Sequence, residues 1–191
     1  MKSTLLFTKK IKEFKAFLVL SFFMGLVVTL SNYLVQFPFN LFGLQEILTY
    51  GAFSYPIAFL ITDSANRIFG KKVARNIVYF GFFVGVLISF FFSLKQIDLI
   101  SIRIAIGSGV AFLAAQLLDI KIFDILRKQI WYIPPLISSI ISSTIDTLLF
   151  FSIAFYATEM NWVTLAFGDL CVKILVAISM LLPFRLVIKY F

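Results

Sequence analysis

Two side chains of opposite charge lie four residues apart in an apolar stretch near the end of the sequence. Asp169 and Lys173 share one face of a helix at this spacing, in the order that favours an ion pair. Lys173 lies about 16 Å along such a helix from Trp162, which is near mid-membrane. Charges at that depth cost roughly 2.5–3.5 kcal/mol each. Two interpretations are open. The two residues form a structural ion pair, or one of them binds a substrate while the other holds it in place.

A second apolar stretch carries a carboxylate near its centre. Asp146 has no residue of opposite charge in its own stretch, and the serines of the segment 139–143 share its helical face. Small hydroxyl residues at this spacing typically serve close helix packing. A carboxylate in hydrocarbon needs a cation, a proton or a ligand. Asp146 is therefore expected to meet Lys173 or Arg103, or to bind a proton or a substrate.

Other polar residues lie within apolar stretches or at their ends. Gln116 has two donors and one acceptor, which suit a planar heterocycle. Asp63 lies near the end of its stretch. The nearby Arg67 could equally well anchor the helix at the lipid headgroups or pair with Asp63. Asn32 has no reason to face lipid. The predicted substrate-binding residues are Asn32, Tyr33, Glu46, Asp63, Gln116, Asp119, Asp146, Asp169 and Lys173.

The residue types that the chain lacks exclude several chemistries. It has no histidine, so no imidazole base, His–metal site or His-ligated haem is expected, and Cys171 alone forms neither an internal disulfide nor a thiolate cluster. There is no G-x-S-x-G motif and no phosphate-binding G-x-x-x-x-G-K-[ST] loop. We therefore expect neither catalysis nor a cofactor or metal, and any ATP hydrolysis would come from partner subunits.

Six apolar stretches must position these side chains. The chain has 191 residues, of which 61% are hydrophobic and 14% charged, too apolar for a water-soluble domain of this size. Each stretch approaches the roughly 20 residues that a spanning helix needs. We predict an all-α polytopic membrane protein with one domain over residues 1–191. The six expected helices cover 16–36, 44–63, 73–94, 101–120, 133–157 and 162–189.

Prolines refine this prediction. Pro134 and Pro135 suit the first turn of the fifth expected helix. Pro56 is expected to kink the second helix, and Pro183 the sixth.

The basic residues are unequally divided between the two sides. Fourteen of the 17 Lys and Arg residues lie in the N-terminal segment, in or beside the second and fourth connections, or at the C-terminus. Only Lys95 and Arg103 belong to the other side. This asymmetry predicts that both termini are cytoplasmic. It also accounts for the net charge of +8 without a nucleic-acid partner, since no recognition motif is present.

Several short motifs occur in a fixed order along the chain. They are Ser31-Asn32-Tyr33-Leu34-Val35-Gln36, Gly51-Ala52-Phe53-Ser54-Tyr55-Pro56 with Thr62-Asp63 and Arg67-Ile68-Phe69-Gly70, Arg103-Ile104-Ala105, Gln116-Leu117-Leu118-Asp119, Asp146-Thr147 with Phe150-Phe151-Ser152-Ile153-Ala154-Phe155, and Asp169 with Lys173. From about residue 31 to 183 the sequence resembles the bacterial queuosine precursor transporter family, also called the vitamin uptake transporter family. The resemblance implies import of 7-cyano-7-deazaguanine, 7-aminomethyl-7-deazaguanine or queuine across the inner membrane for tRNA modification.

The predicted site suits such a nucleobase-like substrate. A carboxylate can accept from the ring N–H and the exocyclic amine of a deazaguanine, an amide can complement its carbonyl, and aromatic rings can stack on the base. We expect a secondary transporter or facilitator that works by alternating access, with the coupling ion and oligomeric state left open. One alternative is the substrate-binding membrane subunit of an ATP-driven vitamin-type importer. Another is a membrane-embedded enzyme or assembly factor.

Overall fold

Helices make up nearly all of the regular structure in the computed structural model, which describes residues 2–35, 37–45, 47–93 and 99–190. Within these ranges the only β-type pairing is an isolated bridge between Pro38 and Thr49. The all-α prediction is thereby confirmed. The elements are α1 (Lys2–Leu34), the 3₁₀ helix η1 (Leu41–Gly43), α2 (Gly51–Ser54), α3 (Pro56–Phe69), α4 (Lys71–Ser93), α5 (Leu99–Leu126), α6 (Ile133–Phe155) and α7 (Trp162–Tyr190).

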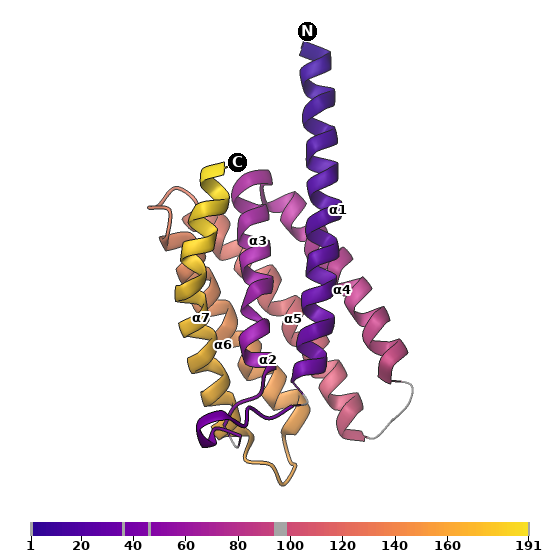
Figure 1. Cartoon of the computed structure of the whole chain (residues 1–191), viewed down its shortest axis with the longest axis vertical. Coiled ribbons are helices and arrows are strands. Elements are labelled where there is room, and N and C mark those ends of the chain that lie inside the picture. Colours follow the sequence, from indigo (N-terminus) through magenta and orange to yellow (C-terminus); the bar gives the residue numbers. More distant parts are fainter. Residues whose placement is uncertain (1, 36, 46, 94–98, 191) are drawn as a thin grey trace.

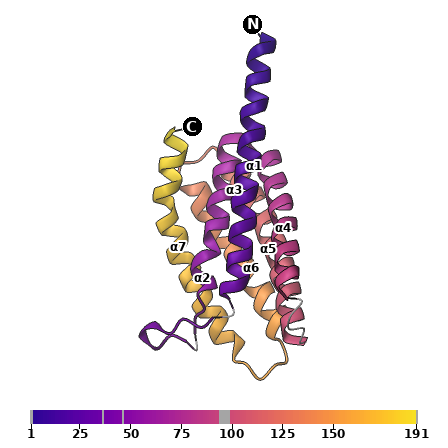
Figure 2. The same ribbon diagram turned by 45° about the vertical axis from the view of Figure 1, so that its right-hand side comes forward.

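The long helices form an up-and-down bundle (Figures 1 and 2). α1 packs along α4, and α5 packs along both α6 and α4, while α6 also packs along α7. α3 lies in the middle, since it contacts α1, α4, α5, α6 and α7. Side chains on α3 therefore meet groups from most of the other helices, and two of the predicted site regions depend on this central position.

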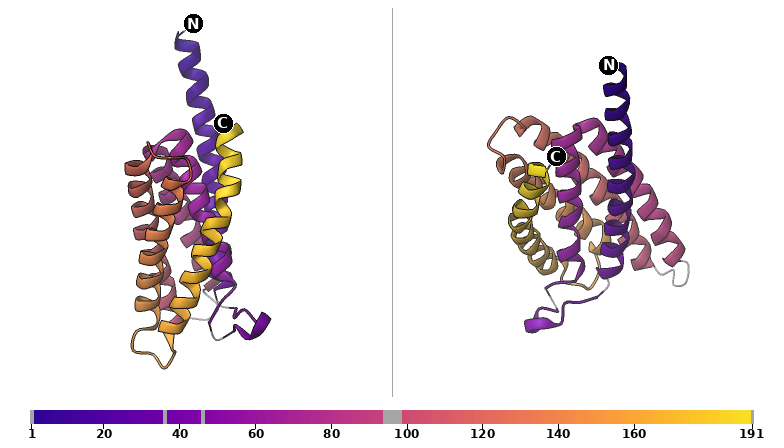
Figure 3. Two further views of the ribbon diagram at one scale, coloured as in Figure 1. Left: turned by 90° about the vertical axis from the view of Figure 1, so that its left-hand side faces the viewer. Right: turned by 45° about the horizontal axis from the view of Figure 1, so that its top comes forward.

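The two ends of the bundle differ in charge and in chain connections. Both termini lie at one end, where the N-terminal turns of α1 project beyond the other helices (Figure 1). The α3–α4 and α5–α6 turns lie at the same end, whereas the α6–α7 turn lies at the opposite end (Figure 3). Exposed basic side chains occur in or beside these two turns at Lys71, Lys72, Arg75, Lys121 and Lys128. We call this the basic end of the bundle.

The distribution of polar side chains is the reverse of that in a water-soluble protein. Large apolar side chains cover the outside: Phe167, Leu175 and Leu182 on α7 are 69%, 66% and 73% exposed. The interior instead holds many buried serine, threonine and carboxylate side chains. An apolar exterior around a polar interior is the arrangement expected where lipid surrounds the helices.

In the part of the chain that the structure describes, three helices are both long and apolar enough to cross a membrane. They are the segments Glu13–Leu34 of α1, Ile133–Phe155 of α6 and Trp162–Tyr190 of α7. α3 is shorter, with 14 residues. α5 has 28 residues, which include Arg103 and Asp119.

The second apolar stretch is not one continuous helix. α2 ends at Ser54, and α3 begins at Pro56, which occupies the first turn of the new helix. Between the two helices Tyr55 keeps helical backbone angles, and the kink expected at Pro56 stays a prediction. Regular α-helix begins at Gly51 rather than at 44, because residues before it form η1, a left-handed turn at Gly43 and the isolated bridge. Pro134 and Pro135 lie in the first turn of α6 as predicted.

Candidate functional site

A buried ion cluster joins α6 to α7. The Lys173 Nζ lies 2.8 Å from Asp146 Oδ2 and 2.5 Å from Asp169 Oδ2. All three side chains are buried, and Lys173 is 4% exposed. The predicted pair within α7 is therefore present, and Asp146 has Lys173 as its cation. With two carboxylates for one ammonium group, the cluster carries one net negative charge when all three are ionised.

Thr147 completes the hydrogen bonding of this cluster. Its hydroxyl donates to Asp169 Oδ2 at 2.8 Å and accepts from Lys173 Nζ at 3.2 Å. Asp146 Oδ1, in contrast, is buried and has no hydrogen-bond partner. A buried carboxylate oxygen without a donor is costly, so it marks the point at which the cluster is ready to accept hydrogen bonds from a bound molecule.

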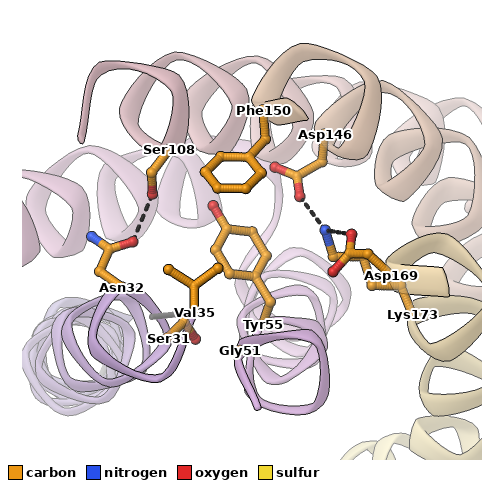
Figure 4. A pocket seen from close by; sticks show the side chains of 10 residues that line it. All are labelled: Ser31, Asn32, Val35, Gly51, Tyr55, Ser108, Asp146, Phe150, Asp169 and Lys173. Atoms are coloured by element: carbon orange, nitrogen blue, oxygen red, sulfur yellow. Dashed lines mark hydrogen bonds and ion pairs between the residues drawn. The ribbon is translucent and has the colours of Figure 1, made fainter. Parts of the chain in front are cut away.

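A polar group from α1 and α5 faces the cluster across a pocket (Figure 4). Ser108 donates to the Asn32 Oδ1 at 2.6 Å, and the hydroxyls of Ser31 and Ser54 lie 2.8 Å apart. Gly51 allows α2 to approach the end of α1 closely, since a Cβ at this position would lie 3.0 Å from the backbone of Val35. This close approach places α2 beside the pocket.

Two aromatic rings separate the polar group from the ion cluster. In Figure 4, Tyr55 and Phe150 meet in the centre of the pocket, with Asn32 and Ser108 on one side and Lys173 on the other. Lys173 Nζ lies 5.1 Å from the centroid of the Tyr55 ring, which is within range of a cation–π contact. Tyr55 lies between α2 and α3 with helical backbone angles, and its N–H donates to the Gly51 carbonyl at 3.1 Å.

The pocket is narrow in this conformation. It is lined by Ser31, Asn32, Val35, Gly51, Tyr55, Ser108, Asp146, Phe150, Asp169 and Lys173. The space that the centre of a water molecule can occupy is about 30 Å³. That volume holds a few water molecules but not a bicyclic base. A flat ligand can enter only if the aromatic side chains or the helices that carry them move apart.

Comparison with known proteins agrees with this arrangement of a polar pocket within an apolar bundle. The model of the family described as "Putative vitamin uptake transporter" matches residues 49–188. The chain belongs to this family. It is 37% identical to the queuosine precursor transporter of Escherichia coli (strain K12), in an alignment that covers 90% of this chain and 86% of that protein.

Two further relatives are named as probable queuosine precursor transporters. The protein from Haemophilus influenzae is 34% identical, over 88% of this chain and 84% of its own length. The protein from Bacillus subtilis is 27% identical, over 69% of this chain and 66% of its own length. No solved structure matches the chain. As a member of the vitamin uptake transporter family with an apolar exterior, the chain is a membrane protein.

In this family member the structure brings together four of the predicted site residues. Asn32, Asp146, Asp169 and Lys173 all line the pocket. Tyr33 does not, because it is 58% exposed and packs against the ring of Phe37. The remaining predicted position on the connection after α1, Glu46, lies outside the described residues.

The other three predicted residues form a second buried region nearer the basic end. The Gln116 Oε1 accepts from Thr62 at 2.5 Å, which ties α5 to α3. Asp63 and Asp119 lie within hydrogen-bonding distance of each other. Asp63 Oδ2 also accepts from Ser139 at 3.4 Å. Arg67 does not pair with Asp63, since its guanidinium donates to the Arg127 carbonyl at 2.8 Å.

Sequence reasoning missed several residues that line or support the pocket. Tyr55, Ser108 and Phe150 are in the lining, and Thr147 supports the ion cluster. Among 25 phenylalanines and seven tyrosines, no local pattern marks which aromatic rings face the interior. The one available signal for Tyr55 was its place immediately before Pro56, where a helix tends to break.

Proposed function

We propose that this chain imports queuosine precursors across the bacterial inner membrane. The substrate class is 7-deazaguanine: 7-cyano-7-deazaguanine, 7-aminomethyl-7-deazaguanine or queuine. The relatives' names suggest this class, and the residues of the pocket are chemically suited to it. The observation that carries the proposal is the buried, unpartnered Asp146 Oδ1 at the edge of the pocket.

A deazaguanine presents its ring N–H and exocyclic amine on one edge. Asp146 Oδ1 is an acceptor without a donor, and Lys173 holds the other oxygen of the same carboxylate in place. A bound base would supply the missing donors on this side of the pocket. Sites built to hydrogen-bond a polar group discriminate strongly against molecules that lack it, because the site's polar atoms are then left unpaired.

The aromatic residues suit the flat faces of the same substrate. Tyr55 and Phe150 come from different helical elements and meet in the pocket (Figure 4). Stacking of an unpaired base on aromatic rings contributes about 1–3 kcal/mol per base. We place the base between these two rings once they separate, with its donor edge on Asp146.

The proposed topology has six spanning segments and cytoplasmic termini. It rests on the basic end, where Lys71, Lys72 and Arg75 lie beside the α3–α4 turn and both chain ends are found (Figure 1). Positive residues are retained on the cytoplasmic side of membrane proteins. The pocket then lies in the outer half of the bundle, and the narrow conformation is one stage of an alternating-access cycle in which the helices move apart.

Uptake by purified protein tests the proposal directly. The full chain in liposomes, without any partner subunit, should take up tritiated 7-cyano-7-deazaguanine, and the Asp146→Asn variant should take up much less. Ser179→Ala is a suitable control, because the Ser179 hydroxyl is exposed and bonds only to the carbonyl of its own helix at Val176.

The outcomes separate the competing functions. Uptake that appears only when an ATP-hydrolysing partner is added would favour the subunit of an ATP-driven importer. Binding followed by a chemically altered product would favour an enzyme. Wild-type uptake by the Asp146→Asn variant would refute the assignment of the donor edge to this carboxylate.

A further inference from the structure

A second acidic site lies nearer the basic end than the pocket does. Asp63 on α3 is 3% exposed, and Asp119 on α5 is 0% exposed. The two carboxyl groups lie within hydrogen-bonding distance of each other, with the serines at 138 and 139 of α6 beside them. Both oxygens of Asp119 and Oδ1 of Asp63 lack a donor in the structure. Two facing carboxylates in a dry interior cannot both be charged, so this geometry requires a proton between them.

No basic side chain that the structure describes neutralises this acid pair. The basic groups on the surrounding helices have other partners or face outward. Lys71 on α4 pairs with Asp124, and Arg67 on α3 binds the Arg127 carbonyl. Arg127, which directly follows α5, binds Asn66 and Asp124, and Arg103 on α5 binds the Ile153 and Tyr156 carbonyls. On α7, Lys173 binds Asp146 and Asp169, and Arg185 lies over Trp131.

The remaining ionisable groups on the packed helices are also distant or exposed. α6 contributes Asp146, which belongs to the ion cluster. The exposed basic side chains are Lys15 on α1, Lys72 and Arg75 on α4, Lys121 and Lys128 on or after α5, and Lys189 on α7. Glu13 lies in the first half of α1, and Tyr55 lies at the pocket. The charge of the acid pair is therefore controlled by its bound proton.

Other buried side chains near the acid pair also have polar atoms without a hydrogen-bond partner. Gln116 lies one turn before Asp119, is fully buried and has an unpartnered Nε2. Ser142 and Ser143 on α6 are buried with unpartnered hydroxyls, between Ser139 at the acid pair and Asp146 at the pocket. Ser139 and Asp146 are seven residues apart, about 10 Å along the helix. Polar atoms spaced this way provide a route for water or a proton between the two sites.

The acid pair also adjoins open space. A cavity between α3, α6 and α7 is lined by Asp63, Ser139, Pro135, Ala177 and Phe184 among others. The space that the centre of a water molecule can occupy there is about 10 Å³, roughly enough for one water molecule. A water molecule in this space would lie beside Asp63 and could exchange a proton with it.

We propose that the Asp63–Asp119 pair is the proton-binding site that couples precursor uptake to the proton gradient. One proton enters with each precursor from the pocket side, passes along the serine face of α6 to the two carboxyls, and leaves toward the basic end. The proton is bound and released unchanged, so no other reactant is needed. This inference rests on the proposed function for its transport part, but the binding of a proton stands independently of the substrate.

Asp146 is the less suitable proton carrier. Its carboxylate is held by Lys173 at 2.8 Å, and this nearby cation favours the ionised form of Asp146. Proton binding at the acid pair, by contrast, removes a repulsion between like charges. In this proposal the substrate binds at the ion cluster and the proton binds at the acid pair.

Infrared spectroscopy of the purified full chain tests proton binding without any substrate. At neutral pH the wild-type protein should show the carbonyl stretch of a protonated carboxylic acid. This band should shift in Asp119→Asn and in Asp63→Asn, where the remaining acid keeps its proton, and should disappear when both residues are replaced by asparagine. Asp124→Asn is the matched control on the same helix, since Asp124 is partly exposed and paired with Lys71. A pH titration of the wild-type band needs no variant and serves if a substituted protein does not fold.

Proteoliposomes test coupling. With the membrane potential clamped by potassium and valinomycin, an external pH one unit below the internal pH should concentrate neutral 7-cyano-7-deazaguanine up to about tenfold, because one proton supplies about 1.4 kcal/mol per pH unit. A protonophore should abolish this accumulation. Asp119→Asn should show the same internal level with and without the gradient, whereas Asp124→Asn should respond as wild type does.

Each result decides a separate statement. If the wild-type protein shows no protonated carboxyl band, or if the band is unchanged in the double variant, proton binding at the pair is wrong. If the band behaves as expected and precursor enters, but the gradient never concentrates it, the coupling is wrong while the proposed function stands. If no precursor enters under any condition, the proposed function fails, and with it the coupling, while the infrared result still judges the proton site.

Discussion

The chain buries two acidic sites in the same helical bundle, and they differ in one component. At the pocket, Asp146 and Asp169 share the ammonium group of Lys173. At the acid pair, Asp63 and Asp119 face each other without a cation among the described residues. A buried carboxylate with a cation stays charged and can hold a ligand by hydrogen bonds, whereas one without a cation must hold a proton. The position of one lysine thus separates the two proposed roles.

Replacement of Lys173 should have the largest effect on folding stability. Lys173→Met leaves two buried carboxylates without a cation, and breaking a buried ion pair in this way costs about 3–5 kcal/mol of folding free energy. Thermal unfolding in detergent should show a strongly lowered transition. Lys71→Met is the matched control, because the exposed Lys71–Asp124 pair contributes about 0–1 kcal/mol. Equal losses for the two variants would contradict the distinction between the cluster and surface pairs.

Neutralisation of the substrate-facing acid should mainly affect binding. Asp146→Asn removes a charged acceptor, and hydrogen bonds to charged groups contribute about 1.5–3 kcal/mol, equivalent to roughly 10- to 100-fold in affinity. Lys173 keeps Asp169 as a partner, so folding should be retained. Equilibrium binding of 7-cyano-7-deazaguanine to the purified variant measures the loss. An unchanged affinity would place the donor edge of the base elsewhere.

The aromatic side of the pocket should contribute by stacking. Tyr55→Ala should weaken precursor binding by about 1–3 kcal/mol, whereas Tyr55→Phe keeps the ring and should retain most of the affinity. Binding isotherms of the two variants make the comparison. If the phenylalanine variant loses as much as the alanine variant, the hydroxyl and not the ring is the important contact.

The smallest effect on stability is expected at the acid pair. Asp119→Asn replaces one member of a proton-sharing pair by a neutral amide, so the free energy of unfolding should change by less than about 1 kcal/mol. Thermal unfolding of Asp119→Asn, measured alongside Lys173→Met, provides the test. A loss as large as that of the lysine variant would show that Asp119 is charged and paired, which would remove the contrast between the two sites.

Much of the architecture could be predicted from the sequence. Apolar stretches of membrane length and the division of basic residues indicated helices with both ends on one side, and the structure places both termini at the basic end. The i, i+4 spacing of Asp169 and Lys173 predicted their ion pair, because contacts within one helix follow from its periodicity. The bounds of the second helix were less predictable, since η1 and the bridge compete with helix before Gly51.

Contacts between helices were beyond the reach of the sequence. Asp146 had two possible cations, and the fold gave it Lys173 because the Arg103 guanidinium instead binds the Ile153 and Tyr156 carbonyls. Asp63 and Asp119 are 56 residues apart, and nothing in either segment indicates that their carboxyls meet.

The sequence alone determined that polar side chains are buried in an apolar bundle, because hydrophobic length and helical spacing are local properties. Only the tertiary structure decided which of them meet. Partner choice depends on how helices far apart in the chain are rotated and aligned, and central α3 brings both Tyr55 to the pocket and Asp63 to the acid pair.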